Sequence, residues 1–140
     1  MPHWKAAVVS LGLLATLAAC EVLGPPSTLP DNAQALAAPP EYRDWWAATE
    51  QCSGRQGQFD AIRWYVVPGA KTLSTSNGPK VGWWSHSREG NRIILAGEFV
   101  ESELVVRHEM LHVLLDRGGH PSEYFQSACQ LTWDTWGHGG

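Results

Sequence analysis

The sequence predicts a small α+β domain in which a mostly antiparallel sheet packs on one central helix, with further helices flanking it. Two observations predict this class. Short segments rich in aromatic and β-branched residues occupy the middle of the chain, and a long apolar segment without Gly or Pro follows them. With 140 residues the chain has room for one modest core, so we expect one functional site.

The N-terminus predicts an export signal. Lys5 precedes a short apolar run that closes with Leu-Ala-Ala-Cys at 17–20, and this run is too short to span a bilayer. Its ending resembles the lipobox of bacterial lipoproteins. The resemblance implies a signal peptide over 1–19, lipidation of Cys20, and a membrane anchor on the extracytoplasmic side of a bacterial membrane. An ordinary cleaved signal with an incidental cysteine is the alternative.

Residues 20–40 are rich in Pro and Ala and are expected to be a tether, which leaves 41–140 as the folded domain. The formal net charge is −4, and it becomes −5 when Lys5 leaves with the signal, since nine basic residues then face fourteen acidic ones. No basic patch is evident, so nucleic acid is not an expected partner. We expect a monomer.

Two further cysteines, Cys52 and Cys129, remain as one pair in an oxidising compartment, and they predict a disulfide. By the loop-entropy argument such a bridge contributes about 4 kcal/mol. The alternative is that one thiol binds zinc or acts as a nucleophile. Neither thiol belongs to a Cys-x-x-Cys pair, which disfavours that alternative.

The other elements follow from periodicity and turn residues. One amphipathic helix is expected before the strands and another after the central helix. A polar stretch rich in Ser, Thr, Asn and Gly is expected to be a loop or a wide hairpin connection. The predicted ranges are helices at 41–51 and 122–133, strands at 59–67, 81–85 and 92–96, and the connection at 71–80.

Residues 98–116 predict the central helix, with two glycines just after it. At 100° per residue, apolar side chains cover most of its circumference, as is typical of a buried helix. One arc is polar and carries His108, Glu109, His112 and Asp116. Because unpaired buried charges are costly, this arc is expected to face partners, a metal or a water-filled cleft.

The arc contains the pattern His-Glu-x-x-His over 108–112. Two histidines four residues apart project from one helix face, close enough to share an ion, and neutral imidazole suits Zn²⁺. Glu109 is placed to act as general base towards a water on the metal. We therefore expect His108 and His112 as zinc ligands and Glu109 as the catalytic base.

The third ligand is expected to be His120, because Gly118-Gly119 can turn the chain back over the helix. The alternative is that His120 is a loop residue without a ligand role, placed there by the turn before Pro121. Asp116 is better placed to orient His112 than to bind metal. The other possible third ligands are Glu123, Asp116, Asp134 and His138.

The 108–112 motif, His120 and the aromatic pair Tyr124-Phe125 together resemble the SprT and WLM-type zincin metallopeptidases. The resemblance covers about residues 104–125 and implies a minimal zincin-like domain with three histidine ligands and a glutamate base. Segments 107–112 and 119–121 also resemble small uncharacterised bacterial lipoproteins. The metzincin pattern is not met, since Leu115 and Gly118 stand where its glycine and third histidine belong.

The expected function is zinc-dependent hydrolysis of peptide bonds by a membrane-anchored metalloendopeptidase of the cell envelope, with a peptide or protein as substrate. Tyr124, with His86 as the second choice, is the candidate oxyanion donor, although packing beside Phe125 is the favoured interpretation of Tyr124. Residues 92–96 occupy the place of the substrate-binding edge strand of zincins, and the alternative is that Ile93, Ile94 and Leu95 belong to the core. The alternatives are a non-catalytic zinc-containing binding module whose tryptophans contact a wall polymer, and a structural lipoprotein without metal.

Overall fold

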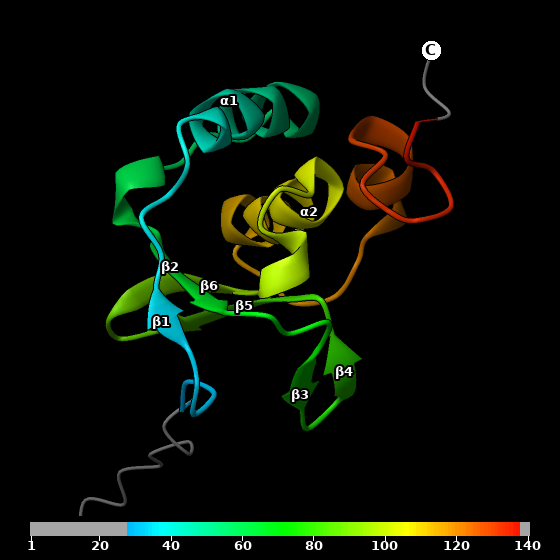
Figure 1. The fold of residues 1–140 in the computed structure, drawn as a ribbon. Coiled ribbons are helices and arrows are strands. Elements are labelled where there is room, and N and C mark those ends of the chain that lie inside the picture. The colour runs from blue at the N-terminus through cyan, green and yellow to red at the C-terminus, as the bar shows by residue number, and fades with distance from the viewer. Residues whose placement is uncertain (1–27, 138–140) are drawn as a thin grey trace, which may run out of the picture.

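A computed structural model describes residues 28–137 of the chain. The predicted signal, the lipidation site Cys20 and the alternative ligand His138 lie outside the described residues. The described chain forms helices plus a mixed sheet, which confirms the predicted α+β class. Figure 1 shows three layers, with the sheet below, α2 (Glu103–Leu115) in the middle and α1 (Glu41–Ser53) above. Within residues 28–137, no helix is both long enough and apolar enough to cross a membrane.

The main sheet has four strands in the order β1-β2-β6-β5. β5 and β6 form an antiparallel hairpin whose turn lies at residues 88–89, just before Gly90, whose φ of 92° suits glycine. β6 pairs in parallel with β2 on its other side, so β6 is central and β5 is an edge strand of this sheet. The expectation that residues 92–96 form the edge was therefore wrong. The strands are β1 (Gln34–Ala35), β2 (Arg63–Val67), β5 (Gly82–Ser87) and β6 (Gly90–Ala96).

The two faces of β6 serve different parts of the core, because successive side chains on a strand point to opposite faces. Ile93 and Leu95 pack towards the helices with Val106 and Met110 of α2. Ile94 and Ala96 face the other side, where Leu73 of a small separate hairpin covers them. That hairpin, β3 (Leu73–Thr75) and β4 (Gly78–Lys80), lies within the connection predicted at 71–80.

The central helix α2 begins later than predicted. Ser102 caps it by accepting a hydrogen bond from the backbone N–H of Val105, and residues Gly97–Phe99 form a separate 3₁₀ turn before it. α2 ends at Asp116, which takes a left-handed conformation with φ of 49°. Each of its buried apolar side chains contributes about 2 kcal/mol to the free energy of unfolding because it is removed from water. This burial holds the helix between α1 and the sheet.

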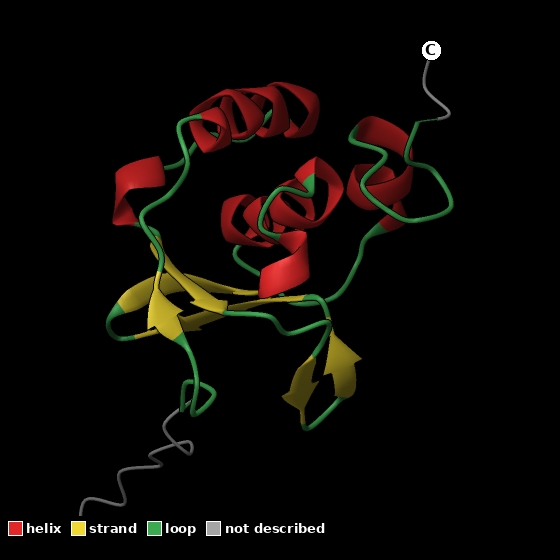
Figure 2. Cartoon of the chain, viewed as in Figure 1, coloured by secondary structure: helices red, strands yellow, loops and turns green. Residues whose placement is uncertain are grey.

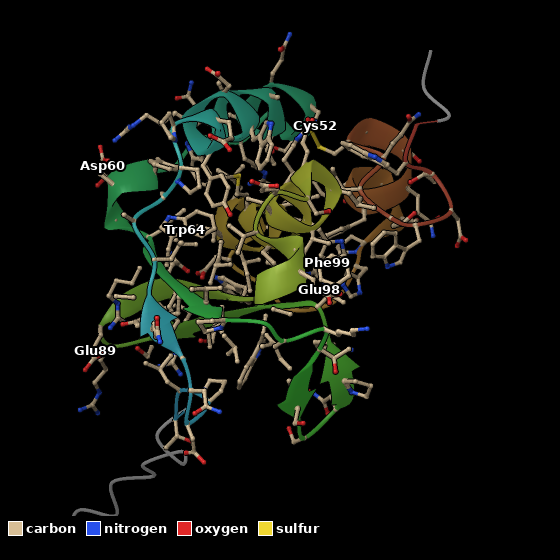
Figure 3. The ribbon with its side chains drawn as sticks, in the orientation of Figure 1. Cys52, Asp60, Trp64, Glu89, Glu98 and Phe99 are labelled. Atoms are coloured by element: carbon tan, nitrogen blue, oxygen red, sulfur yellow. A yellow bond between two sulfur atoms is a disulfide. The ribbon has the colours of Figure 1, made fainter. Side chains whose placement is uncertain are left out.

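The predicted disulfide is present between Cys52, in α1, and Cys129, with a Cα–Cα distance of 5.1 Å. Figure 3 shows it as the yellow bond at the end of α1 beside Cys52. The segment it holds is a π-helix, η3 (Glu123–Ala128), shorter than the helix predicted over 122–133. Figure 2 shows that all the helices lie on one side of the main sheet.

The folded part of the chain includes residues assigned from the sequence to the tether. β1 pairs with β2 in antiparallel register, with Gln34 opposite Val66 and Ala35 opposite Tyr65. Leu36 then packs against the main core. A strand of two residues is too short to show an alternating pattern in the sequence. The boundary predicted at residue 41 therefore lies after the first residues that belong to the sheet.

Candidate metal centre

The structure brings together the three histidines expected as ligands. His108 and His112 lie one turn apart on α2, and His120 approaches them from the loop that follows the helix. One ligand atom from each lies within 4.8 Å of the other two. The Nε2 atoms of His108 and His120 are 3.0 Å apart. In the part of the chain that the structure describes, this is the one group of three or more potential ligands with such spacing.

Backbone carbonyls orient the two helical imidazoles. His108 Nδ1 lies 2.7 Å from the carbonyl oxygen of Leu131, and His112 Nδ1 lies 2.9 Å from that of Arg117. Since a carbonyl can only accept, each Nδ1 carries the proton and donates. The lone pair of each ring is therefore on Nε2, which is the pattern of second-shell bonds typical of histidine metal ligands.

Aromatic rings pack against the histidines, of which His112 is buried, His108 is half-buried and His120 is exposed. The ring of Phe125 is fully buried and lies 4.8–4.9 Å, centroid to centroid, from all three imidazoles. Trp84 of β5 stacks on His112 at 5.7 Å with an interplanar angle of 12°. Burial lowers the pKa of His108 and His120 and lowers that of His112 to about 4. The rings are thus neutral near pH 7, the form that binds metals.

Glu109 is 6 % exposed and lies against the first residues of β5. Burial raises the pKa of its carboxyl group to about 8, against the opposing effects of a hydrogen bond from the Trp84 backbone and the charge of Lys80. A Cβ atom on Gly82 would lie only 2.9 Å from both Cγ and Oε1 of Glu109. The glycine thus allows β5 to approach the carboxylate closely.

The histidines and Glu109 line a cleft of about 730 Å³. The β3–β4 hairpin contributes one part of its lining, the first half of β5 another, and the residues after Leu131 a third. Trp133 is 67 % exposed in this last part. The lining includes Lys80, Gly82, Trp83, Trp84, His108, Glu109, His112, Gly118, His120, Trp133 and Asp134.

The donor set fits Zn²⁺. Two nitrogens bound to one tetrahedral zinc ion at about 2.05 Å lie about 3.3 Å apart, close to the 3.0 Å between His108 and His120 Nε2. Three neutral imidazoles leave the fourth position of a tetrahedral ion for water or substrate. The side chain of Glu109, one residue after His108, lines the same cleft.

The other acidic candidates do not join this group. Asp116 pairs with His86 at 2.6 Å, so it does not orient His112 as expected. Glu123 is exposed and does not line the cleft, and Asp134 lines it outside the three-histidine group. His86, the second choice as oxyanion donor, also lies outside the cleft lining.

Tyr124 does not reach the metal centre. Its hydroxyl accepts a hydrogen bond of 3.0 Å from the Arg55 guanidinium, and its side chain is not part of the cleft lining. The neighbouring Phe125 takes the inward position instead. The structure therefore gives Tyr124 a packing role and does not bring it to the three histidines, where the oxyanion donor was expected.

The sequence reasoning did not find several residues that shape this centre. Phe125 and Trp84 were noted only for their aromatic character, and Gly82 had no signal besides its place before two tryptophans. Leu131 acts through its carbonyl, which no side-chain pattern reveals. Comparison with known proteins decides nothing further. No protein family, curated protein or solved structure matches this chain.

Proposed function

We propose that this protein is a zinc-dependent metallopeptidase. The observation that carries the proposal is that ligand atoms of three neutral imidazoles lie within 4.8 Å of one another, in a cleft that a buried glutamate also lines. His108, His112 and His120 would hold the ion. Bound zinc supplies Lewis acidity, which polarises a scissile carbonyl and lowers the pKa of a water molecule.

Glu109 is the group that moves the proton. As water adds to the peptide carbon, its proton passes to the Glu109 carboxylate, which then gives it to the leaving amine as the C–N bond breaks. Placing the carboxylate beside Gly82 and the Trp84 backbone fixes its position, so little reorganisation is needed during the reaction. Glu109, whose pKa burial raises to about 8, would be ionised near neutral pH if a divalent cation were held by the three histidines, because the nearby positive charge would lower that pKa.

The outer edge of β5 is the surface that suits an extended peptide. Within the described chain, β5 pairs with β6 on one side only, and Gly82, Trp83 and Trp84 line the cleft. A peptide added to this edge would lie along the cleft with its backbone paired to β5. β5 thus takes the role that the sequence reasoning gave to residues 92–96.

The test is Glu109→Gln, with Glu98→Gln as the control at an exposed carboxylate outside the cleft. Each protein is loaded with zinc and incubated with reduced, carboxymethylated casein and with a mixed peptide library, and new termini are detected by mass spectrometry. We expect cleavage by the wild type and the control, and a loss of at least about 10³-fold in Glu109→Gln with zinc content unchanged.

The competing function is a zinc-containing binding module. The exposed Trp133 favours it, since an accessible indole at a cleft suits a ligand with an apolar or sugar face. A wild type that holds one zinc ion but produces no new termini in any library would favour this second function over the peptidase.

A further inference from the structure

A single cation of the arginine or lysine type lines the cleft among its described residues. It is Lys80, the last residue of β4, two positions before Gly82. The hairpin is anchored by the pairing of Lys80 with Leu73, a residue that is 2 % exposed. The backbone of Lys80 is therefore held in place by the hairpin, while its side chain is exposed to solvent.

The ammonium group of Lys80 is available for a ligand. No hydrogen bond or ion pair joins it to another residue in 28–137, unlike Arg43, Arg63 and Arg107, which each pair with a carboxylate. The other charged side chain in the lining besides Glu109 is Asp134, which is exposed.

The field of Lys80 reaches the reacting groups. Its charge is among the causes that lower the pKa values of His108, Glu109 and His120. This agrees with the place of Lys80 in the lining of the same cleft.

We propose that Lys80 is a catalytic residue that stabilises the negative charge formed on the scissile carbonyl oxygen, the role expected of Tyr124. The proposal rests on the peptidase function proposed above. When the water oxygen bonds to the carbonyl carbon, the π electrons move to the carbonyl oxygen and the water proton moves to Glu109. Lys80 donates an N–H hydrogen bond to that oxygen until the carbonyl re-forms and the amine leaves with the proton. A positively charged donor already placed at the cleft acts on the charge that develops on the oxygen in the transition state.

The experiment compares Lys80→Met, Lys80→Arg and the control Lys71→Met, an exposed lysine outside the cleft. The substrate is the library peptide that the wild type cleaves fastest. We expect Lys80→Met to lower kcat about 10²-fold with KM changed less than about twofold, Lys80→Arg to recover most of the loss, and Lys71→Met to match the wild type.

A second measurement needs no turnover. The zinc affinity of each variant is measured by competition with a chelator, starting from metal-free protein. Because a nearby positive charge repels Zn²⁺, its removal in Lys80→Met should tighten zinc binding about fivefold, whereas Lys71→Met should leave it unchanged. A phosphinic analogue of the same peptide mimics the tetrahedral intermediate. Its Kd for zinc-loaded Lys80→Met should exceed its Kd for the wild type by the same factor by which kcat falls.

Each outcome decides the proposal. If the zinc affinities of Lys80→Met and Lys71→Met are equal, Lys80 does not face the centre and the proposal fails. If Lys80→Met raises KM for acidic peptides alone and spares kcat, the lysine selects substrate and does not stabilise the oxyanion. If zinc binding shifts as expected but the wild type cleaves no peptide, the peptidase itself is refuted, which is a distinguishable failure.

Discussion

Gly82→Ala tests whether the close approach of β5 to Glu109 positions the base. The added Cβ would lie 2.9 Å from Cγ and Oε1 of Glu109 and 3.1 Å from Cγ1 of Val105. The first of these contacts involves the inner part of a buried side chain, and Gly82 is itself held in register with Leu95. Either the carboxylate or the strand must therefore move by several tenths of an ångström.

The expected cost of this overpacking is about 1–3 kcal/mol in the free energy of unfolding. For a domain of this size that corresponds to a fall in Tm of roughly 4–20 °C. Because displacement of a catalytic group by about 1 Å costs on the order of 10²-fold, kcat should fall by roughly one to two orders of magnitude. Zinc affinity should change little, since none of the three nearest atoms belongs to a histidine.

Gly118→Ala is the matched control. Gly118 also lines the cleft, but a Cβ there meets nothing within 4 Å and its φ is not in the left-handed region. The control should keep kcat and lie within about 0.5 kcal/mol of the wild type. Urea unfolding, kcat and zinc content are measured for both variants. If Gly82→Ala retained wild-type stability and kcat, the reasoning about this contact would be refuted.

Two further predictions concern the bridge and pH. Replacing both Cys52 and Cys129 with Ala should lower the free energy of unfolding by about 2–4 kcal/mol and also weaken zinc binding, because Cys129 is two residues before the carbonyl that orients His108; unchanged zinc affinity would contradict this second effect. The metal-free domain should lose stability as pH rises from about 6.5 to 8. Burial raises the pKa of Glu109 to about 8 in the folded state, so folding favours its protonated form and stability falls as pH rises towards 8. The pKa of His112 is lowered, so its effect is to make stability rise with pH up to about 6.5 and to leave stability unchanged above that pH. Urea unfolding of metal-free Glu109→Gln should not show this decline, and an equal decline in both proteins would refute the assignment.

The parts of the site that lie on α2 could be predicted because helix geometry is local. The spacing of His108, Glu109 and His112 fixes their common side whatever surrounds the helix, and Gly119, with a φ of 73°, allows the return of His120. Asp116 shares this spacing, yet it lies at the helix end in a left-handed conformation and pairs with His86. Periodicity fails there because the helix stops.

The arrangement of the sheet could not be predicted in the same way. The strands at residues 81–85 and 92–96 were found from composition, but the parallel pairing of β6 with β2 joins segments far apart in the chain. That pairing makes β6 central and leaves β5 at the edge beside the cleft. In η3, a π-helical backbone rather than an α-helical one sets the directions of Tyr124 and Phe125, so helical spacing did not indicate which of them faces the histidines.

The most direct test of the metal centre is zinc-edge X-ray absorption on the purified wild type, with total zinc determined on the same sample. The account predicts one zinc ion per chain with three nitrogen ligands at about 2.0–2.1 Å and one oxygen ligand from water. His120→Ala should lose one nitrogen ligand and bind zinc more weakly. A wild type that folds without binding zinc, or a site whose ligand set is unchanged by His120→Ala, would contradict the account.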